Sequence, residues 1–500
     1  MTILAFHDKD GGAVDAEQAG IVLRLGLFFD GTGNNKYNSA TGAQCRVSDP
    51  GLDAQAAADL RQRCRTYGYD DSGAIPDTSY GCEVTNIARL YDLYPDQSQE
   101  PLPAQADHVY VPVYLEGIGT SRGQADSAYS QGTGQGSSGV LARVKQAPAL
   151  VLEKLRNFQA HNPARRIHRI EVDLFGFSRG AAAARHCAND LLKGPESQLA
   201  LALPAGSPML TTEFAWHPGQ HVALNFIGLF DTVAGIVAPL KKDFSVRDGN
   251  TPGLDLCLAP GTARQVVHLV AEHEYRHNFS LNGTENDLLV PGCHSDVGGG
   301  YFPESVEKVL LSKPDSGLCA LGKPDQDSEV YRRTQAQLDG SREQWQRYFS
   351  PEGLRVALWG SDNGPHQVRE GLPHRRVFAA IEGQRPVRGE LSLVYLRIMR
   401  ELGVRAGVAF HPLDPEDGST ALPDELHAIG AKLLARAVSE SCEALSDDEQ
   451  ALLLRRYIHL SAHWNGAMGW NNSNLDVMFV NRPAKDNLRM KHRHESPSAG

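Results

Sequence analysis

Residues 167–184, IHRIEVDLFGFSRGAAAA, decide the fold class of this chain. The run from Ile167 to Phe175 is short, apolar and rich in branched and aromatic residues, which is typical of a buried strand. It leads into Gly-x-Ser-x-Gly at residues 176–180, and an alanine-rich helix is expected over Gly180 to Leu192. A strand, a tight glycine turn and a helix in this order indicate a unit of an α/β protein.

Three other runs have the same character, and each ends in a polar turn. They are Val22–Phe29, Val222–Phe230 and Leu288–Val290. Helical patterns lie between the runs, so we expect a mostly parallel sheet with helices on both faces. Ligands of such sheets bind beyond the carboxyl ends of the strands. The residues that follow each run are therefore the first candidates for a functional site.

The remaining sequence predicts insertions and a helical end. Helices are expected at Leu391–Leu402, Asp424–Val438 and Asp447–His459, the first with an apolar face that suggests core packing. The insertion at 303–361 is charged and irregular, and the insertion at 116–139 is rich in glycine and serine. The expected organisation is an N-terminal segment 1–20, a catalytic domain 21–410 with insertions 37–80, 116–139 and 303–361, a helical region 411–480, and a flexible basic tail 481–500.

Composition excludes several classes of function. The 500 residues carry 49 basic and 60 acidic side chains, a net charge of −11, which disfavours nucleic acid as a partner. No apolar run approaches the roughly 20 residues of a spanning helix. The start of the chain has no secretory signal pattern, so we expect synthesis in the cytoplasm. The eight cysteines contain no Cys-x-x-Cys pair, which favours buried thiols over a disulfide scaffold or a zinc site.

Ser178 is the candidate nucleophile. In a Gly-x-Ser-x-Gly turn the serine lies on a strained strand-to-helix bend, and flanking glycines let the backbone segments pass closely. The helix that follows presents the Arg179 backbone N–H, and its dipole favours negative charge at that point. Arg179 is therefore expected to stabilise an oxyanion.

A serine nucleophile needs a histidine base and a carboxylate to orient it. His294 follows a strand end in a glycine-rich loop, whereas His186 points away within the elbow helix, and His268, His273 and His277 fall in a helix-like segment. Asp231 directly follows the run that ends at Phe230. The chain order Ser178, Asp231, His294 is that of α/β-hydrolases. Asp296 is the alternative acid, although its place in the His294 loop favours a structural role.

The first loop, Asp30-Gly31-Thr32, predicts the second oxyanion donor. It resembles the Asp-x-Asp-Gly-Thr of aspartate phosphatases, but Phe28 occupies the nucleophile position and excludes aspartyl-phosphate chemistry. In α/β-hydrolases a loop after an early strand supplies a backbone N–H, so Gly31 or Thr32 is expected to do so here. The glycine cluster at 132–136 lacks the ending of a phosphate-binding loop, and no nucleotide site is inferred.

Five motifs occur together in one order. They are LFFDGTGN (27–34), YLEGIGT (114–120), GFSRGA (176–181), FDTV (230–233) and HSDVGGGY (294–301). This set resembles the first family of bacterial type VI secretion lipase effectors, over about residues 21–303. By motif position, the family's catalytic serine, aspartate and histidine fall on Ser178, Asp231 and His294.

The resemblance implies a phospholipase A that cleaves bacterial glycerophospholipids without a metal or organic cofactor. It implies a phospholipid membrane surface as substrate, a secretion spike as carrier, a cognate immunity protein, and delivery by type VI secretion into the target-cell periplasm. Two alternatives stay open. One is a cytosolic esterase, thioesterase or peptidase with the same triad, and the other is an inactive hydrolase fold that acts as an adaptor.

Overall fold

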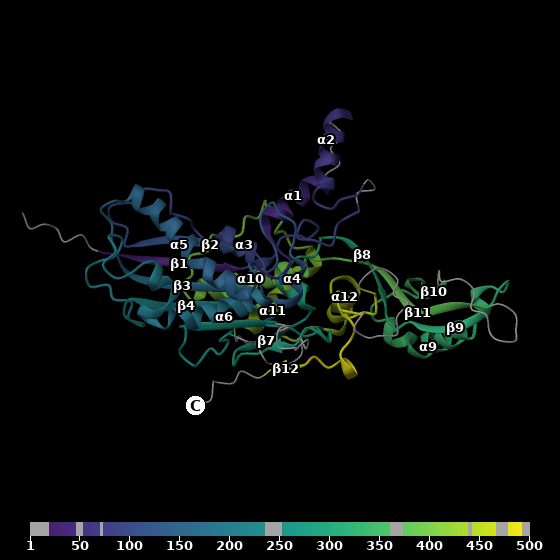
Figure 1. Ribbon diagram of the computed structural model, residues 1–500. Coiled ribbons are helices and arrows are strands. Elements are labelled where there is room, and N and C mark those ends of the chain that lie inside the picture. The colour runs from purple at the N-terminus through teal and green to yellow at the C-terminus, as the bar shows by residue number, and fades with distance from the viewer. Residues whose placement is uncertain are drawn as a thin grey trace, which may run out of the picture.

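A six-stranded parallel sheet forms the centre of the molecule (Figure 1). The computed structural model describes residues 20–46, 54–70, 74–235, 253–360, 374–438, 443–466 and 479–492. All neighbouring strands of the sheet run in parallel, in the order β2-β1-β3-β4-β5-β7. The strands are β1 (Ile21–Phe29), β2 (His108–Leu115), β3 (Ile167–Phe177), β4 (Val222–Phe230), β5 (Gln265–Ala271) and β7 (Asp287–Val290).

Helices cover both faces of this sheet, because successive side chains of each strand point to opposite faces and both sets are apolar. Leu174 belongs to one buried cluster and the next residue, Phe175, to the other. The first face is covered by α5 (Val140–His161), α6 (Arg179–Leu191) and α7 (Gln198–Ala202). The second is covered by α3 (Asn86–Leu93), α10 (Leu391–Arg405), α11 (Asp424–Ala437) and α12 (Asp447–Arg456). The predicted α/β class is confirmed.

The four predicted strands are all present, but the sheet has two more. The prediction that residues around His268 form a helix-like segment is wrong, since His268 lies within β5. A single polar residue inside a short apolar run obscured the strand pattern there. β2 contains Pro112 and lies at the edge of the sheet, where the missing N–H of proline is tolerated.

Residues 305–360 and 374–387 form a lobe beside the sheet (Figure 1). It consists of β8 (Ser305–Leu310), β9 (Asp315–Ala320), α9 (Glu329–Trp345), β10 (Leu354–Gly360) and β11 (His374–Val387). β11 pairs antiparallel with β8, β9 and β10, and α9 packs its buried Val330 and Leu338 against them. The expectation of an irregular insertion at 303–361 is therefore wrong. Its strands are short and mostly half-exposed, so the apolar signal is weak.

The apolar face of α10 is core, as the sequence predicts. Its six apolar residues are at most 5% exposed: Leu391, Val394, Tyr395, Ile398, Met399 and Leu402. They pack with α11, α12 and the phenylalanines of β3 and β4 in one cluster.

Val394→Asp is expected to prevent stable folding, because it would bury an unpaired carboxylate at a position that is 1% exposed. The cost should exceed about 4 kcal/mol. Val404→Asp is the matched control in the same helix, where valine is 39% exposed, and it should melt near the wild-type temperature. A Val394→Asp protein that melts near the wild-type temperature would contradict the assignment of this face to the core.

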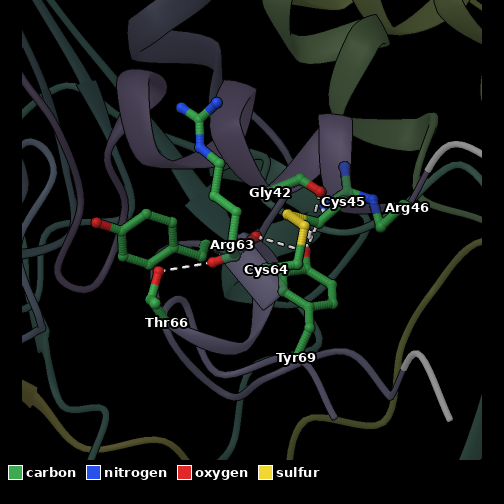
Figure 2. The surroundings of a disulfide bond; sticks show 8 residues. Gly42, Cys45, Arg46, Arg63, Cys64, Thr66 and Tyr69 are labelled. Carbon is green, nitrogen blue, oxygen red and sulfur yellow. Dashed lines mark hydrogen bonds between the residues drawn. A yellow bond between two sulfur atoms is a disulfide. The ribbon is translucent and has the colours of Figure 1, made fainter. Parts of the chain in front are cut away.

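The insertion at 37–80 holds a disulfide between Cys45 and Cys64, across 19 residues of sequence (Figure 2). It joins α1 (Lys36–Arg46) to α2 (Ala54–Arg65). The interpretation of all eight cysteines as unpaired thiols is wrong for these two. Among the described residues of this insertion, Tyr69 and Tyr80 belong to a small apolar cluster, and a covalent link compensates for so small a core. The Tyr69 hydroxyl adds hydrogen bonds to the Gly42 and Tyr80 carbonyls.

Cys64→Ser is expected to lower the local stability of this insertion by about 3 kcal/mol, since the open chain regains its loop entropy. The main sheet should keep its melting temperature. Hydrogen exchange of α1 and α2 measures the effect, with Cys82→Ser as a control because Cys82 is a free thiol nearby in sequence. Equal protection of α1 in the two variants would contradict a stapling role.

Two other expected surface segments are tied to the body. Residues 116–139 contain α4 (Ala128–Thr133) and are held through Arg143, which donates to the Gly117 carbonyl at 3.2 Å. The tail returns to the body as β12 (Lys491–His492), which pairs with β6 (Leu281–Asn282). The expected solvation of this basic tail is wrong for Arg489, whose side chain is 5% exposed. Within the described residues, no helix is long and apolar enough to cross a membrane.

Candidate active site

Ser178 lies on the sharp turn between β3 and α6. Its φ of 58° and ψ of −124° form a strained conformation of the kind stored at functional sites. Both flanking glycines are needed for close approach of the backbone. A Cβ at Gly180 would lie 2.3 Å from the Phe29 carbonyl oxygen, and one at Gly176 would lie 2.5 Å from Ala181 Cα. This is the geometry expected of a nucleophile turn.

His294 and Asp231 are in direct contact, 63 residues apart in sequence. His294 Nδ1 lies 2.5 Å from Asp231 Oδ2, and both side chains are buried. Asp231 begins the loop after β4, with a φ of 41°, and His294 is the first residue of α8 (His294–Gly298). The carboxylate therefore favours the tautomer of the neutral imidazole that carries its proton on Nδ1 and leaves Nε2 unprotonated.

Ser178 lies at the same end of the sheet as this pair. Its N–H donates to the carbonyl of Phe230 at 3.0 Å, directly before Asp231. The ring of Phe177, directly before Ser178, packs on the His294 ring with centroids 4.6 Å apart. No hydrogen bond joins Ser178 and His294 within the part of the chain that the structure describes. Such contacts often tighten only when substrate binds.

A buried ion pair between Glu274 and Arg276 supports the start of α8 at His294. Glu274 accepts the His294 backbone N–H at 3.3 Å and binds Arg276 through both carboxylate oxygens. Burial raises the pKa of Glu274, but the charge and hydrogen bonds of Arg276 outweigh it and lower the pKa to about 2. Arg276 also lies over Phe279, whose ring meets His294 edge-on at 4.9 Å. The imidazole is thus held between two aromatic rings.

Asp296, the alternative acid, contacts a different histidine. Its carboxylate accepts the Cys293 N–H at 2.9 Å and lies 2.7 Å from His459 Nδ1. It therefore caps α8 and ties this helix to the segment after α12. The remaining candidate histidines also have structural contacts: His268 with Asp287, His186 with the Asp255 N–H, and His273 with the Gly292 N–H.

The loop that follows β1 and begins at Asp30 approaches the turn at Ser178 through Thr32. Arg179 Nε donates to Thr32 Oγ1 at 2.6 Å, which brings the loop next to the start of α6. The Gly31 N–H already donates to Asp30 Oδ1 at 2.7 Å. Asp30 is buried and also accepts from Thr85 and Tyr114, so it anchors the loop. Of the two expected loop donors, the Thr32 N–H is the better candidate, together with the Arg179 N–H.

Arg489 is the site residue that the sequence analysis missed. Its guanidinium donates to both oxygens of Asp231, at 2.7 and 2.8 Å. Burial alone would raise the pKa of Asp231, but the charge of Arg489 and the hydrogen bond with His294 hold it well below its usual value. Asp231 is therefore a carboxylate at neutral pH. No local pattern around Arg489 marks it, because its partner lies 258 residues away.

No family model matches the sequence, and no curated protein matches it. Among solved structures, the chain is similar to the Tle1 effector bound to the VgrG spike from the type VI secretion system. The TM-score is 0.67 at 27% sequence identity, and the match covers 95% of this chain and 94% of that chain.

The chain has the fold of a Tle1-like effector. The resemblance drawn from the five motifs is confirmed at this level. A second structure, of an uncharacterized protein from Pseudomonas aeruginosa, matches with a TM-score of 0.36 and 17% identity over 87% of this chain and 53% of that chain. That match adds nothing to the fold assignment.

Two cavities lie apart from the turn at Ser178. One of about 860 Å³ is lined by Tyr348, Arg385 and Arg456 where the lobe meets the body, and one of about 490 Å³ lies beside α11 and α12. Neither is lined by Ser178, Asp231 or His294. Among the described residues, no group of three or more His, Cys, Asp or Glu side chains is placed to hold a metal ion.

The pH profile of kcat/KM should have an acid limb below pH 6.5, because the ordinary pKa of histidine is about 6.5 and that of His294 is lowered. Burial lowers the pKa of His294, against the hydrogen bond and charge of Asp231, which raise it. Only the neutral imidazole can accept the serine proton, so activity rises as pH increases through this pKa. The quantity to measure is kcat/KM on a soluble ester from pH 4 to 9. An acid limb clearly above pH 6.5 would contradict the burial of His294.

Proposed function

We propose that this chain is a serine hydrolase that cleaves acyl esters of bacterial glycerophospholipids, with phospholipase A specificity. The observation that carries the proposal is the buried contact between His294 and Asp231 beside the strained Ser178 turn. The fold adds support, because it is similar to that of an effector from a type VI secretion system. The five sequence motifs, which resemble those of lipase effectors, give the substrate class.

In the proposed reaction, Ser178 Oγ attacks the ester carbonyl while His294 Nε2 takes its proton. The oxyanion lies against the N–H groups of Arg179 and Thr32, and Asp231 stabilises the imidazolium. Collapse of this intermediate breaks the ester bond, and His294 returns the proton to the leaving lysophospholipid. Water then attacks the acyl-serine by the same steps and releases the fatty acid. Apart from the substrate and the attacking water, all groups in these steps come from the chain itself.

The partners follow from the same reasoning. The similar Tle1 effector is bound to a VgrG spike. We propose a spike protein as the carrier of this chain, delivery into the periplasm of a target cell, and a cognate immunity protein in the producer.

Lipid analysis tests the function. Phosphatidylethanolamine vesicles are incubated with the wild type, Ser178→Ala and the control Ser207→Ala, which changes a serine near the opposite end of β3. We expect lysophosphatidylethanolamine and free fatty acid from the wild type and the control only. If soluble esters are cleaved but vesicles are not, the chain is an esterase of another kind. If neither is cleaved, the adaptor alternative is favoured.

A further inference from the structure

Arg489 donates hydrogen bonds to both carboxylate oxygens of Asp231, the candidate catalytic acid. Asp231 Oδ1 accepts from the Ala271 N–H at 3.0 Å and from Arg489 Nη1. Asp231 Oδ2 accepts from Arg489 Nη2 and faces His294 Nδ1. Arg489 is itself fixed, because its Nε donates to the Phe279 carbonyl at 2.7 Å. The acid therefore has one orientation, and a residue near the C-terminus sets it.

Two other buried histidines show what is specific to this pair. His268 contacts Asp287 and His459 contacts Asp296, each at 2.7 Å. Neither of these carboxylates accepts a hydrogen bond from an arginine within the described ranges, although the charge of Arg185 acts on Asp287 and His268. Their histidines are also unsuited to catalysis, since His268 Nε2 accepts the Thr232 N–H and His459 Nε2 is buried without a partner among the described residues. Of these three carboxylates, Asp231 is the one that an arginine of the described residues contacts directly.

We propose that Arg489 is a positioning residue of the active site: it keeps Asp231 ionised and oriented, so that His294 holds its proton on Nδ1. The C-terminal segment thereby completes the site. The inference rests on the proposed function only in requiring that Ser178 reacts through His294, and it is independent of which ester is the substrate.

The physical reason is the burial of Asp231, whose side chain is 0% exposed. A carboxylate without water needs a compensating charge, and a neutral imidazole does not supply one. Without Arg489 the carboxyl group would take up a proton, keep it, and donate a hydrogen bond to His294 Nδ1. The imidazole would then carry its proton on Nε2, and Ser178 would have no base.

The other charged groups around the pair do not replace Arg489. Glu274 and Arg276 form their own ion pair behind His294. His268, which lies near Asp231, is engaged with Asp287. On this side of the site, Arg489 is the cation that contacts Asp231 among the described residues.

The test measures inactivation of the full-length chain by a fluorophosphonate probe from pH 5 to 9. In this reaction the Ser178 Oγ–phosphorus bond forms, fluoride leaves, and the serine proton passes to His294. Arg489→Gln removes the charge, Arg489→Lys keeps the charge but not the two-pronged contact, and Lys491→Gln is the control for a lost charge on the same segment, where Lys491 is exposed. Thermal melting accompanies each variant.

Arg489→Gln should lower the maximal inactivation rate at pH 7 by between about 10-fold and 10⁴-fold, the upper figure being the cost of the wrong tautomer. The apparent binding constant of the probe should stay the same. Its acid limb should move to higher pH by about one unit or more, since loss of the cation favours protonation of both Asp231 and His294. Arg489→Lys should keep the wild-type acid limb with a smaller loss of rate, and Lys491→Gln should match the wild type.

Folded Arg489→Gln protein with the wild-type rate and pH profile would overturn the inference. If this variant does not fold, Arg489→Lys decides, because an unchanged inactivation rate there would overturn it equally. Labelling of wild-type Ser178 without cleavage of phospholipid would refute the proposed function and leave this inference to the variants. Absence of any label on Ser178 would overturn both.

Discussion

Ser178→Ala and His294→Ala are each expected to lower turnover about 10³- to 10⁶-fold while the protein stays folded. Without Ser178 no acyl-enzyme forms, and without His294 the hydroxyl keeps its proton. Because the two groups act in one step, the double variant should be no slower than the slower single variant. The comparison needs initial rates on a soluble ester, with folding checked by thermal melting.

Losses that multiply in the double variant would contradict a shared step. Retention of activity in His294→Ala would also contradict it and would direct attention to another base. Ser207→Ala again serves as the control, because it makes the same chemical change at the other end of β3.

Asp231→Asn is expected to cost about 10⁴-fold in turnover, because an amide can hold the imidazole in the wrong tautomer. It should also destabilise the fold by about 3 kcal/mol or more, since the buried Arg489 loses its counter-charge. Asp296→Asn should cost stability instead, about 1 to 3 kcal/mol, because one carboxylate oxygen accepts the N–H groups of both Cys293 and His459. Its turnover should stay within about tenfold of the wild type, since it does not contact His294.

The two variants should be compared at a temperature where both are folded. Near-normal turnover in Asp231→Asn together with lost turnover in Asp296→Asn would show that the acid has been assigned to the wrong residue.

The sheet and the elbow could be predicted from the sequence because their signals are local. β4 is a nine-residue apolar run with a single polar side chain, Asn225, and the glycines around Ser178 allow close backbone contacts. β5 was missed because His268 interrupts it, although this histidine is buried and paired with Asp287. The first part of the lobe could not be predicted because β8, β9 and β10 each bury few apolar residues.

The candidate site likewise contains residues that a local sequence pattern predicts and residues that it does not. Asp231 and His294 follow strand ends, so their positions in sequence suggest their roles. Arg489 and the Cys45–Cys64 disulfide depend on contacts between segments that local patterning does not relate. The basic residues near Lys485 predicted a flexible tail, but one of them, Arg489, has a buried partner in Asp231.

The most direct test of the proposed mechanism is to map the site of a fluorophosphonate label by peptide mass spectrometry. We expect one modified residue, Ser178, in the wild type, with labelling strongly reduced in His294→Ala and Asp231→Asn. A label on another residue, or labelling of Ser178 at an unchanged rate in His294→Ala, would contradict it.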